Sequence, residues 1–304
     1  MVNSLLVAAA VFLTTPVAAA EDSTLIMFWN VENFFGWKAE AMKDKHWTRK
    51  KFLRECQAIS KAVLWVSDEY GRPPDLIGLA EVEDRKVIET LLRETPLRRL
   101  GYGIVHYDSP DPRGIDVALL FRKERLKLLC SKPLRISGLA TRDILLARFE
   151  RPGGDSLTVL VNHHPSKYGG NSAWRREAAM ARLEAATDSL MAAGERNIVA
   201  MGDFNDTPES AAGYSEIMVN LAAPLARKGI GTIKYSGRWE MIDMFFISPA
   251  LASGNPGAEM RVEIIPFLMV KDSAHSGEKP LRTFSGPRYV GGVSDHCPIT
   301  LVIR

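Results

Sequence analysis

Apolar residues recur along this chain with two periods, one typical of helices and one typical of strands. Over residues 48–69 they recur at spacings of three and four, and Gly71 follows, which predicts a long amphipathic helix. A second long helix is predicted over residues 172–193, ended by Gly194. Residues 84–93 predict a shorter helix between them.

Short apolar runs bounded by turn residues predict strands between and after these helices. The predicted strands cover residues 24–29, 76–79, 116–122, 144–150, 157–161, 198–201, 244–247, 262–265 and 299–303. Strands outnumber helices, and several follow one another through short turns. This mixture favours an α/β fold with two mixed, mostly antiparallel sheets flanked by helices.

Residues 1–20 differ from the rest of the chain because they carry no charged side chain. An apolar run over residues 5–13, then Pro16 and three alanines before Glu21, predicts a secretory signal peptide cleaved after Ala20. The alternative is an uncleaved anchor, but the run is shorter than the ~20 residues a spanning helix needs. We therefore expect a periplasmic or secreted protein with one domain over residues 21–304 and no stable membrane insertion after processing.

Composition narrows the class of protein further. The 304 residues are 46% hydrophobic and 25% charged, which excludes collagen-like, disordered and multispan membrane proteins. Three cysteines without a CxxC pair argue against a disulfide framework and a structural zinc site. A net charge of +3 is too small for a dedicated DNA-binding protein.

Acids, amides and imidazoles stand where apolar runs end. Asp203 and Asn205 follow the run 198–201 and are two residues apart, so in extended backbone they face one side and could hold a phosphoryl oxygen or a water. An ordinary turn is the alternative. Asp295 and His296 directly precede the last predicted strand, which requires a bend if both serve a site.

Other polar residues have similar settings. Asp243 precedes an apolar run and could orient an imidazole. His163 and His164 are adjacent at a strand end and face opposite sides, so we expect at most one of them in a site. Lys167 and Arg175 flank the start of the second long helix and could attract a phosphate, or could be ordinary solvated side chains.

Glu81 follows a buried run directly, where a carboxylate needs a partner such as a cation. Asp116 precedes another apolar run and could orient a histidine or start a turn. Convergence of these acids would repel a phosphate, and a bound Mg²⁺ or Mn²⁺ would reverse that charge. Oxygen ligands without cysteine favour such a hard cation.

Seven motifs in order give the chain a family resemblance over nearly its whole length. They are Trp29–Phe35 (WNVENFF), Ala80–Glu83 (AEVE), Arg113–Asp116 (RGID), Asn162–Ser166 (NHHPS), Gly202–Pro208 (GDFNDTP), Ile242–Asp243 and Ser294–His296 (SDH). The set resembles the deoxyribonuclease I-like endonuclease/exonuclease/phosphatase superfamily, in a secreted bacterial type.

The resemblance implies a four-layer α/β sandwich and hydrolysis of phosphate esters that depends on a divalent metal, Mg²⁺ or Mn²⁺. It implies that Glu81 is a metal ligand with Asn30 near it and that Asp295 completes the metal side. It also implies that Asp203 and Asn205 hold water and phosphate, and that two pairs form, His163 with Asp116 and His296 with Asp243. His164 receives no catalytic role.

We therefore predict a phosphodiesterase of nuclease type with a phosphate-ester substrate, DNA or RNA among the candidates. Lys167, Arg175 and Asn30 are the predicted substrate-binding residues, and we expect a monomer. A phosphatase of small-molecule or lipid phosphates on the same scaffold is one alternative. A non-catalytic binding protein that kept the fold is another.

Overall fold

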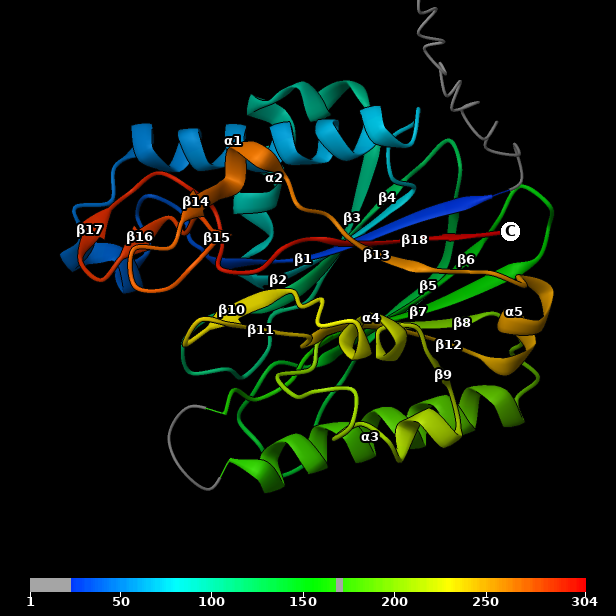
Figure 1. The fold of residues 1–304 in the computed structure, drawn as a ribbon. Coiled ribbons are helices and arrows are strands. Elements are labelled where there is room, and N and C mark those ends of the chain that lie inside the picture. Colours follow the sequence, from blue (N-terminus) through cyan, green and yellow to red (C-terminus); the bar gives the residue numbers. More distant parts are fainter. Residues whose placement is uncertain (1–22, 168–171) are drawn as a thin grey trace, which may run out of the picture.

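Two six-stranded sheets lie face to face and helices cover their outer faces, which makes four layers (Figure 1). The computed structural model describes residues 23–167 and 172–304. The predicted signal peptide lies outside the described residues. The first sheet has the order β13 (Met260–Val262), β18 (Ile299–Ile303), β1 (Thr24–Phe34), β2 (Leu76–Val82), β4 (Asp116–Arg122), β3 (Tyr102–His106).

The second sheet has the order β5 (Lys127–Leu134), β6 (Ile144–Glu150), β7 (Ser156–His163), β8 (Ile198–Asp203), β12 (Asp243–Ile247), β9 (Val219–Asn220). Helices α1 (Arg49–Glu69) and α2 (Arg85–Glu94) lie on the first sheet's side, and α3 (Ala173–Ala192) lies on the second's (Figure 1). The short helix α4 (Ala223–Arg227) follows β9. A short helix, α5 (Pro249–Gly254), follows β12. Three two-stranded hairpins complete the sheets: β10 (Ile233–Tyr235) with β11 (Arg238–Glu240), β14 (Met269–Lys271) with β15 (Glu278–Pro280), and β16 (Phe284–Ser285) with β17 (Arg288–Tyr289).

Each large sheet contains one parallel pair at its centre. In the described residues these pairs are β1–β2 and β7–β8, and the other neighbours run antiparallel. The carboxyl ends of two parallel strands meet at one edge of a sheet, and an antiparallel neighbour begins at that edge. Polar residues that follow β1, β2, β7 and β8, or precede β12 and β18, are therefore brought to one end of the molecule.

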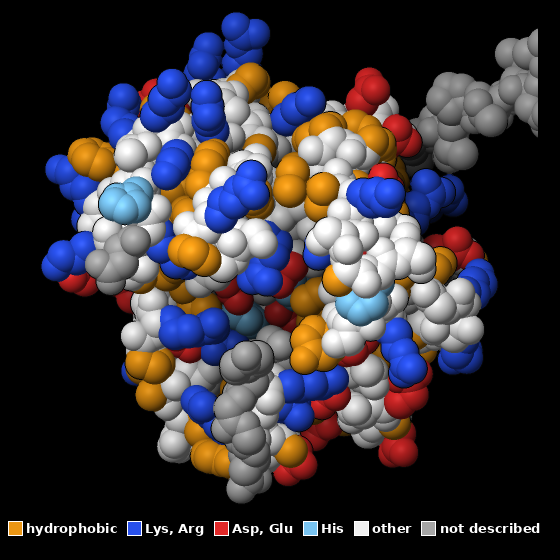
Figure 2. Space-filling model, turned by 60° about the vertical axis from the view of Figure 1, so that its left-hand side comes forward, with side chains coloured by type: hydrophobic (Ala, Val, Ile, Leu, Met, Phe, Trp, Pro, Cys, Tyr) orange, Lys and Arg blue, Asp and Glu red, His pale blue; other side chains and the backbone are white. Residues whose placement is uncertain are grey.

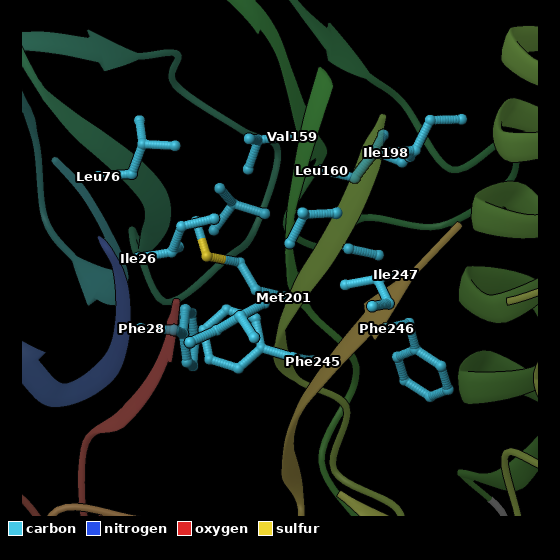
Figure 3. Packing of buried hydrophobic residues seen from close by; sticks show 14 of the residues in the cluster. Ile26, Phe28, Leu76, Val159, Leu160, Ile198, Met201, Phe245, Phe246 and Ile247 are labelled. Atoms are coloured by element: carbon cyan, nitrogen blue, oxygen red, sulfur yellow. The ribbon is translucent and has the colours of Figure 1, made fainter. Parts of the chain in front are cut away.

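The core follows the two-residue period of the strands. Ile26 and Phe28 of β1 point between the sheets, whereas Met27 and Trp29 point toward the helix-covered side. Between the sheets, Met201 lies beside Phe28 and Phe245 (Figure 3). A Cβ at Gly78 would lie 2.7 Å from Met201 Cε, so the Met201 side chain packs directly against the backbone of β2 there.

The α/β fold with two mixed sheets is confirmed, and most element bounds agree within three residues. The long helix begins at Arg49 because the Thr48 hydroxyl caps it, accepting from the Lys51 N–H at 3.3 Å. The predicted strand over residues 262–265 is wrong in position, since the strand observed is β13. Its pairing with β18 ends at Val262 because Pro298, which accepts from Glu263 N–H, has no N–H to return.

The cysteines and the helices give two further observations. Cys56 and Cys297 are buried and Cys130 is exposed, and all three are free. Within residues 23–167 and 172–304, no helix is both long enough and apolar enough to span a bilayer.

Candidate active site

Backbone irregularities at the ends of β1 and β2 bring the acidic side chains of Glu32 and Glu81 near each other. The β1–β2 register shifts between Asn30 and Phe34, and Glu32 has a φ of 45°. The β2–β4 register shifts at Glu81, which has a φ of 63°. Non-glycine residues with positive φ are uncommon and collect at functional sites. The Asn33 N–H donates to Glu81 Oε2 at 2.9 Å and joins the two irregular segments.

In the second sheet, three titratable residues stand side by side on neighbouring strands. Asp203 pairs in register with His163 on β7 and with Asp243 on β12, so the three side chains share one face. A Cβ on Gly202 would lie 2.2 Å from the Asn162 carbonyl oxygen. Glycine at this position therefore permits the close β7–β8 approach that sets His163 beside Asp203.

Asp203 joins the two sheets. Its Oδ2 accepts from Asn30 Nδ2 at 3.0 Å and lies 3.7 Å from His163 Nε2 and 3.9 Å from His296 Nε2. Its Oδ1 accepts from the Asn205 N–H at 2.8 Å. Burial, with Asp243 nearby, raises the pKa of Asp203 to about 7 although His296 opposes this. A carboxyl group with such a pKa can accept a proton near neutral pH.

The two imidazoles beside Asp203 have opposite protonation tendencies. Burial lowers the pKa of His296, but the Asp243 carboxylate, with Asp203 and Asp295, more than offsets this and raises it well above the ordinary value. His296 Nδ1 lies 2.7 Å from Asp243 Oδ2, the pairing that the family resemblance implies. Burial, together with Arg142 and Arg113, holds the pKa of His163 well below the ordinary value. The surroundings therefore favour the neutral form of His163 and the protonated form of His296.

His163 Nε2 lies 3.7 Å from both Glu81 Oε1 and Asp203 Oδ2, whereas His164 is directed elsewhere. The His164 ring packs edge-on against Phe204, with ring centroids 4.9 Å apart. Burial lowers its pKa to about 3. As the alternation predicted, the adjacent histidines face opposite sides of the strand.

The predicted pairing of His163 with Asp116 is wrong. Asp116 Oδ2 lies 3.2 Å from His106 Nε2, and its Oδ1 accepts from the Ser109 N–H at 2.9 Å. The cause is strand order, since β4 lies between β2 and β3 and the Asp116 side chain meets the last residue of β3. Order along the chain does not reveal that neighbour.

The geometric basis for placing Asn205 beside Asp203 is also wrong. The strand ends at Asp203, and Asn205 has a left-handed φ of 50° rather than extended backbone. Its side-chain amide donates to the His164 carbonyl oxygen at 3.0 Å. Asn205 therefore supports Asp203 through its backbone N–H and holds the turn with its side chain.

The basic residues predicted to bind substrate have partners elsewhere. Lys167 Nζ lies 3.7 Å from Asp206 and 3.9 Å from Glu240. Arg175 donates to the Ala140 carbonyl oxygen at 3.4 Å, so the structure does not bring it to Asp203. Arg113 lies closer to the acids, half-exposed and with Nη1 4.0 Å from Glu81 Oε1.

Glu32 is a site candidate that the sequence reasoning missed. Its Oε1 accepts from Arg282, and its Oε2 is buried without a hydrogen-bond partner. Burial, with Asp295 and Glu81 nearby, raises its pKa to about 7, although Arg282 opposes this. Its place two residues after Asn30 in the first motif was the available signal.

The acidic residues fit a hard divalent cation. Asp295 and Glu81 are near enough to Glu32 to raise its pKa, and the unpartnered Glu32 Oε2 indicates negative charge that is only partly compensated. This end of the molecule is hollowed, with acidic and histidine side chains at the base and lysine and arginine side chains around it (Figure 2). An anionic ligand and a divalent cation are therefore both compatible with the hollow.

Comparisons with known proteins give one sequence-family match and several structural matches. A sequence model described as Endonuclease/Exonuclease/phosphatase family matches residues 25–304. No curated protein sequence matches the chain significantly.

Solved structures share the fold at low sequence identity. D. rerio TDP2 complexed with single-strand DNA product is 16% identical, with a TM-score of 0.57 over 93% of this chain and 99% of that chain. The human Nocturnin catalytic domain with bound sulfate is 19% identical, with a TM-score of 0.60 over 93% and 94%. A mannosyl-6-phosphatase of Bacteroides thetaiotaomicron is 13% identical, with a TM-score of 0.62 over 92% and 100%.

Proposed function

Since the chain belongs to the endonuclease/exonuclease/phosphatase family, we propose that it is a phosphodiesterase of nuclease type that acts at the site around Asp203. Members of this family are divalent-metal-dependent phosphoric ester hydrolases, and the chain is one of them. The substrate and the metal are what the proposal adds.

One observation carries the proposal: the buried carboxylate of Asp203 lies between two buried imidazoles, those of His163 and His296. His163 and His296 approach the same oxygen at 3.7 and 3.9 Å, with pKa values shifted in opposite directions. Hydrolysis of a phosphate ester needs a group that accepts a proton from water and a group that donates to charged oxygen. Asp203 and His296 supply these two groups, 3.9 Å apart.

In the proposed reaction, Asp203 orients the attacking water and accepts its proton. Asn30 Nδ2 and the Asn205 N–H fix the two carboxylate oxygens for this task. His296, held by Asp243, donates to a phosphoryl or leaving-group oxygen, and neutral His163 hydrogen-bonds a phosphoryl oxygen. Arg113, half-exposed beside Glu81, binds a further oxygen of the phosphate.

Glu32, Glu81 and Asp295 are the residues that would hold the divalent cation, with Asn30 next to them. When bound, such an ion polarises the phosphoryl oxygen and stabilises developing negative charge. Mg²⁺ and Mn²⁺ both suit these oxygen donors.

A diester is favoured over a monoester because the hollow is bordered by lysine and arginine side chains that could contact flanking phosphates (Figure 2). TDP2, which shares the fold, has been solved with single-strand DNA product, whereas another structure with this fold is a mannosyl-6-phosphatase. A phosphatase of small or lipid phosphates is therefore the alternative outcome.

The test compares kcat/KM for a nucleotide diester, a phosphomonoester and sphingomyelin at one Mn²⁺ concentration. We expect the diester to be hydrolysed fastest, and DNA cleavage to be weakly sequence-specific and suppressed by salt. A monoester preference of about tenfold or more, some 1.4 kcal/mol in transition-state stabilisation, would replace the nuclease by a phosphatase. An exported, monomeric protein remains a prediction that rests on residues 1–20 and on the expected single domain.

A further inference from the structure

Arg282 is a cation placed among the acidic side chains proposed to hold the metal. Its Nε donates to Glu32 Oε1 at 2.8 Å, and a terminal nitrogen donates to the same oxygen. The terminal nitrogen also lies 3.5 Å from Asp295 Oδ2. Half of the Arg282 side chain is exposed, whereas that of Glu32 is only 12% exposed. Arg282 therefore neutralises part of a largely buried acidic group.

The segment that carries Arg282 is anchored on both sides. The next residue, Thr283, is buried, and its hydroxyl donates to Glu55 Oε1 of α1 at 2.5 Å. Arg282 itself forms a bridge with Val293, and the Val293 N–H donates to the Leu281 carbonyl oxygen at 2.8 Å. The position of the guanidinium is thus set by buried contacts.

The same packing fixes Arg282 relative to Asp295. A Cβ on Gly292 would lie 1.9 Å from the Leu281 carbonyl oxygen, so glycine is needed for the two segments to lie against each other. The chain continues from Val293 through Ser294, whose hydroxyl donates to the Asn30 carbonyl oxygen at 2.6 Å. Arg282, Asp295 and the end of β1 therefore form one connected unit.

This arrangement puts two cations in competition. A divalent cation that uses the Glu32 or Asp295 carboxylate must share it with the guanidinium, and like charges repel. Glu32 Oε2 is the oxygen left without a partner, while Oε1 is engaged by Arg282.

We propose that Arg282 is a resident counter-cation that lowers the affinity of this acidic centre for a divalent metal and stabilises its carboxylates while the metal is absent. The inference rests on the proposed function, because that function assigns Glu32 and Asp295 to the metal. It adds a role in setting metal affinity to a residue outside the predicted site.

The test measures Mn²⁺ binding by isothermal titration calorimetry for the wild-type protein and for Arg282→Gln. Arg288→Gln is the matched control, since Arg288 is an exposed arginine of β17 on the same part of the chain. We expect Arg282→Gln to lower the Kd for Mn²⁺ about tenfold, because a half-exposed charge at this range is partly screened. The control should bind like the wild type.

Thermal unfolding gives a second readout. In chelator, Arg282→Gln should melt below the wild type because its buried carboxylates lose their counter-cation. Mn²⁺ should then raise its Tm by more than it raises the wild-type Tm, since tighter binding to the folded state stabilises it more.

An Arg282→Gln variant that binds Mn²⁺ no more tightly than the wild type would overturn the inference alone. Arg282→Lys keeps the charge and should bind within about threefold of the wild type; a tenfold gain in that variant would show that packing, not charge, sets the affinity. A wild-type protein that binds no Mn²⁺ would instead contradict the proposed function itself.

Discussion

At the residue scale, the protonation states of His163 and His296 decide what the site can do. Asp243 is the largest cause that raises the pKa of His296 against the effect of burial. In Asp243→Asn, burial should dominate and the pKa of His296 should fall. The imidazolium would then be lost at lower pH, and the alkaline limb of the pH–rate profile should move to lower pH.

The measurement is kcat/KM against pH for the wild type and Asp243→Asn. An unchanged alkaline limb would remove His296 as the proton donor. The free energy of unfolding should also depend on the protonation of His296. A raised folded-state pKa stabilises the fold below the unfolded pKa of His, about 6.5, and this contribution is lost as pH rises through the folded value.

The neighbouring histidines offer a matched pair of substitutions. His163 faces Glu81 and Asp203, whereas His164 packs on Phe204. We expect His163→Asn to lower kcat/KM by about 10²–10³-fold, the usual contribution of a hydrogen-bond donor to a charged oxygen of the transition state. His164→Asn should lower Tm, because the ring packs on Phe204, but should leave kcat/KM close to that of the wild type. The reverse pattern would place His164 in the site.

Residue identity could be predicted better than residue contacts. Asp203, Asp243 and His296 could be proposed from their places beside apolar runs, and the His296–Asp243 contact is present. The Asp116 partner could not be inferred, because it depends on β3 lying beside β4. Glu32 lies within the first motif, but the alternating pattern does not place its side chain, because its φ of 45° departs from extended backbone.

At the element scale, the parallel pair β7–β8 positions both His163 and Asp203. Gly202→Ala should push these strands apart, since the new Cβ would meet the Asn162 carbonyl oxygen. We expect a loss of about 1–3 kcal/mol in unfolding free energy, typical of overpacking, together with lower activity.

Gly254→Ala at the end of α5 is the control, since a Cβ there meets nothing within 4 Å. It should be neutral or slightly stabilising in a helical position. Equal Tm values for the two variants, measured by circular dichroism, would contradict the close-approach argument.

Long elements could be predicted from the sequence and short ones could not. Helix α1 repeats its apolar spacing over 21 residues, which leaves little ambiguity. The hairpins β10–β11, β14–β15 and β16–β17 have strands of two or three residues, which are too short to show an alternating pattern of apolar and polar residues. The hairpin segments around residues 281–293 nevertheless place Arg282.

At the scale of the whole molecule, the active site exists only because two similar sheets face each other. Asn30 comes from the first sheet and His296 from the segment that leads into it, while His163 and Asp203 come from the second sheet. Their order in sequence could be matched to a family pattern, which predicted the layers. The contacts across the sheets depend on packing that no local pattern contains.

The most direct test of the account is hydrolysis of a nucleotide diester by the wild type and by Asp203→Asn, each with Mn²⁺ and with chelator. Asn keeps the shape of Asp203 and removes its buried charge, but it replaces one of two accepting oxygens by an NH₂ group, so Tm should fall modestly while the fold is kept. We predict turnover by the wild type only with Mn²⁺, and a loss of about 10²-fold or more in Asp203→Asn at a temperature where circular dichroism shows the variant to be folded. Wild-type activity in chelator, or a fully active Asp203→Asn, would contradict a metal-dependent phosphoesterase centred on Asp203.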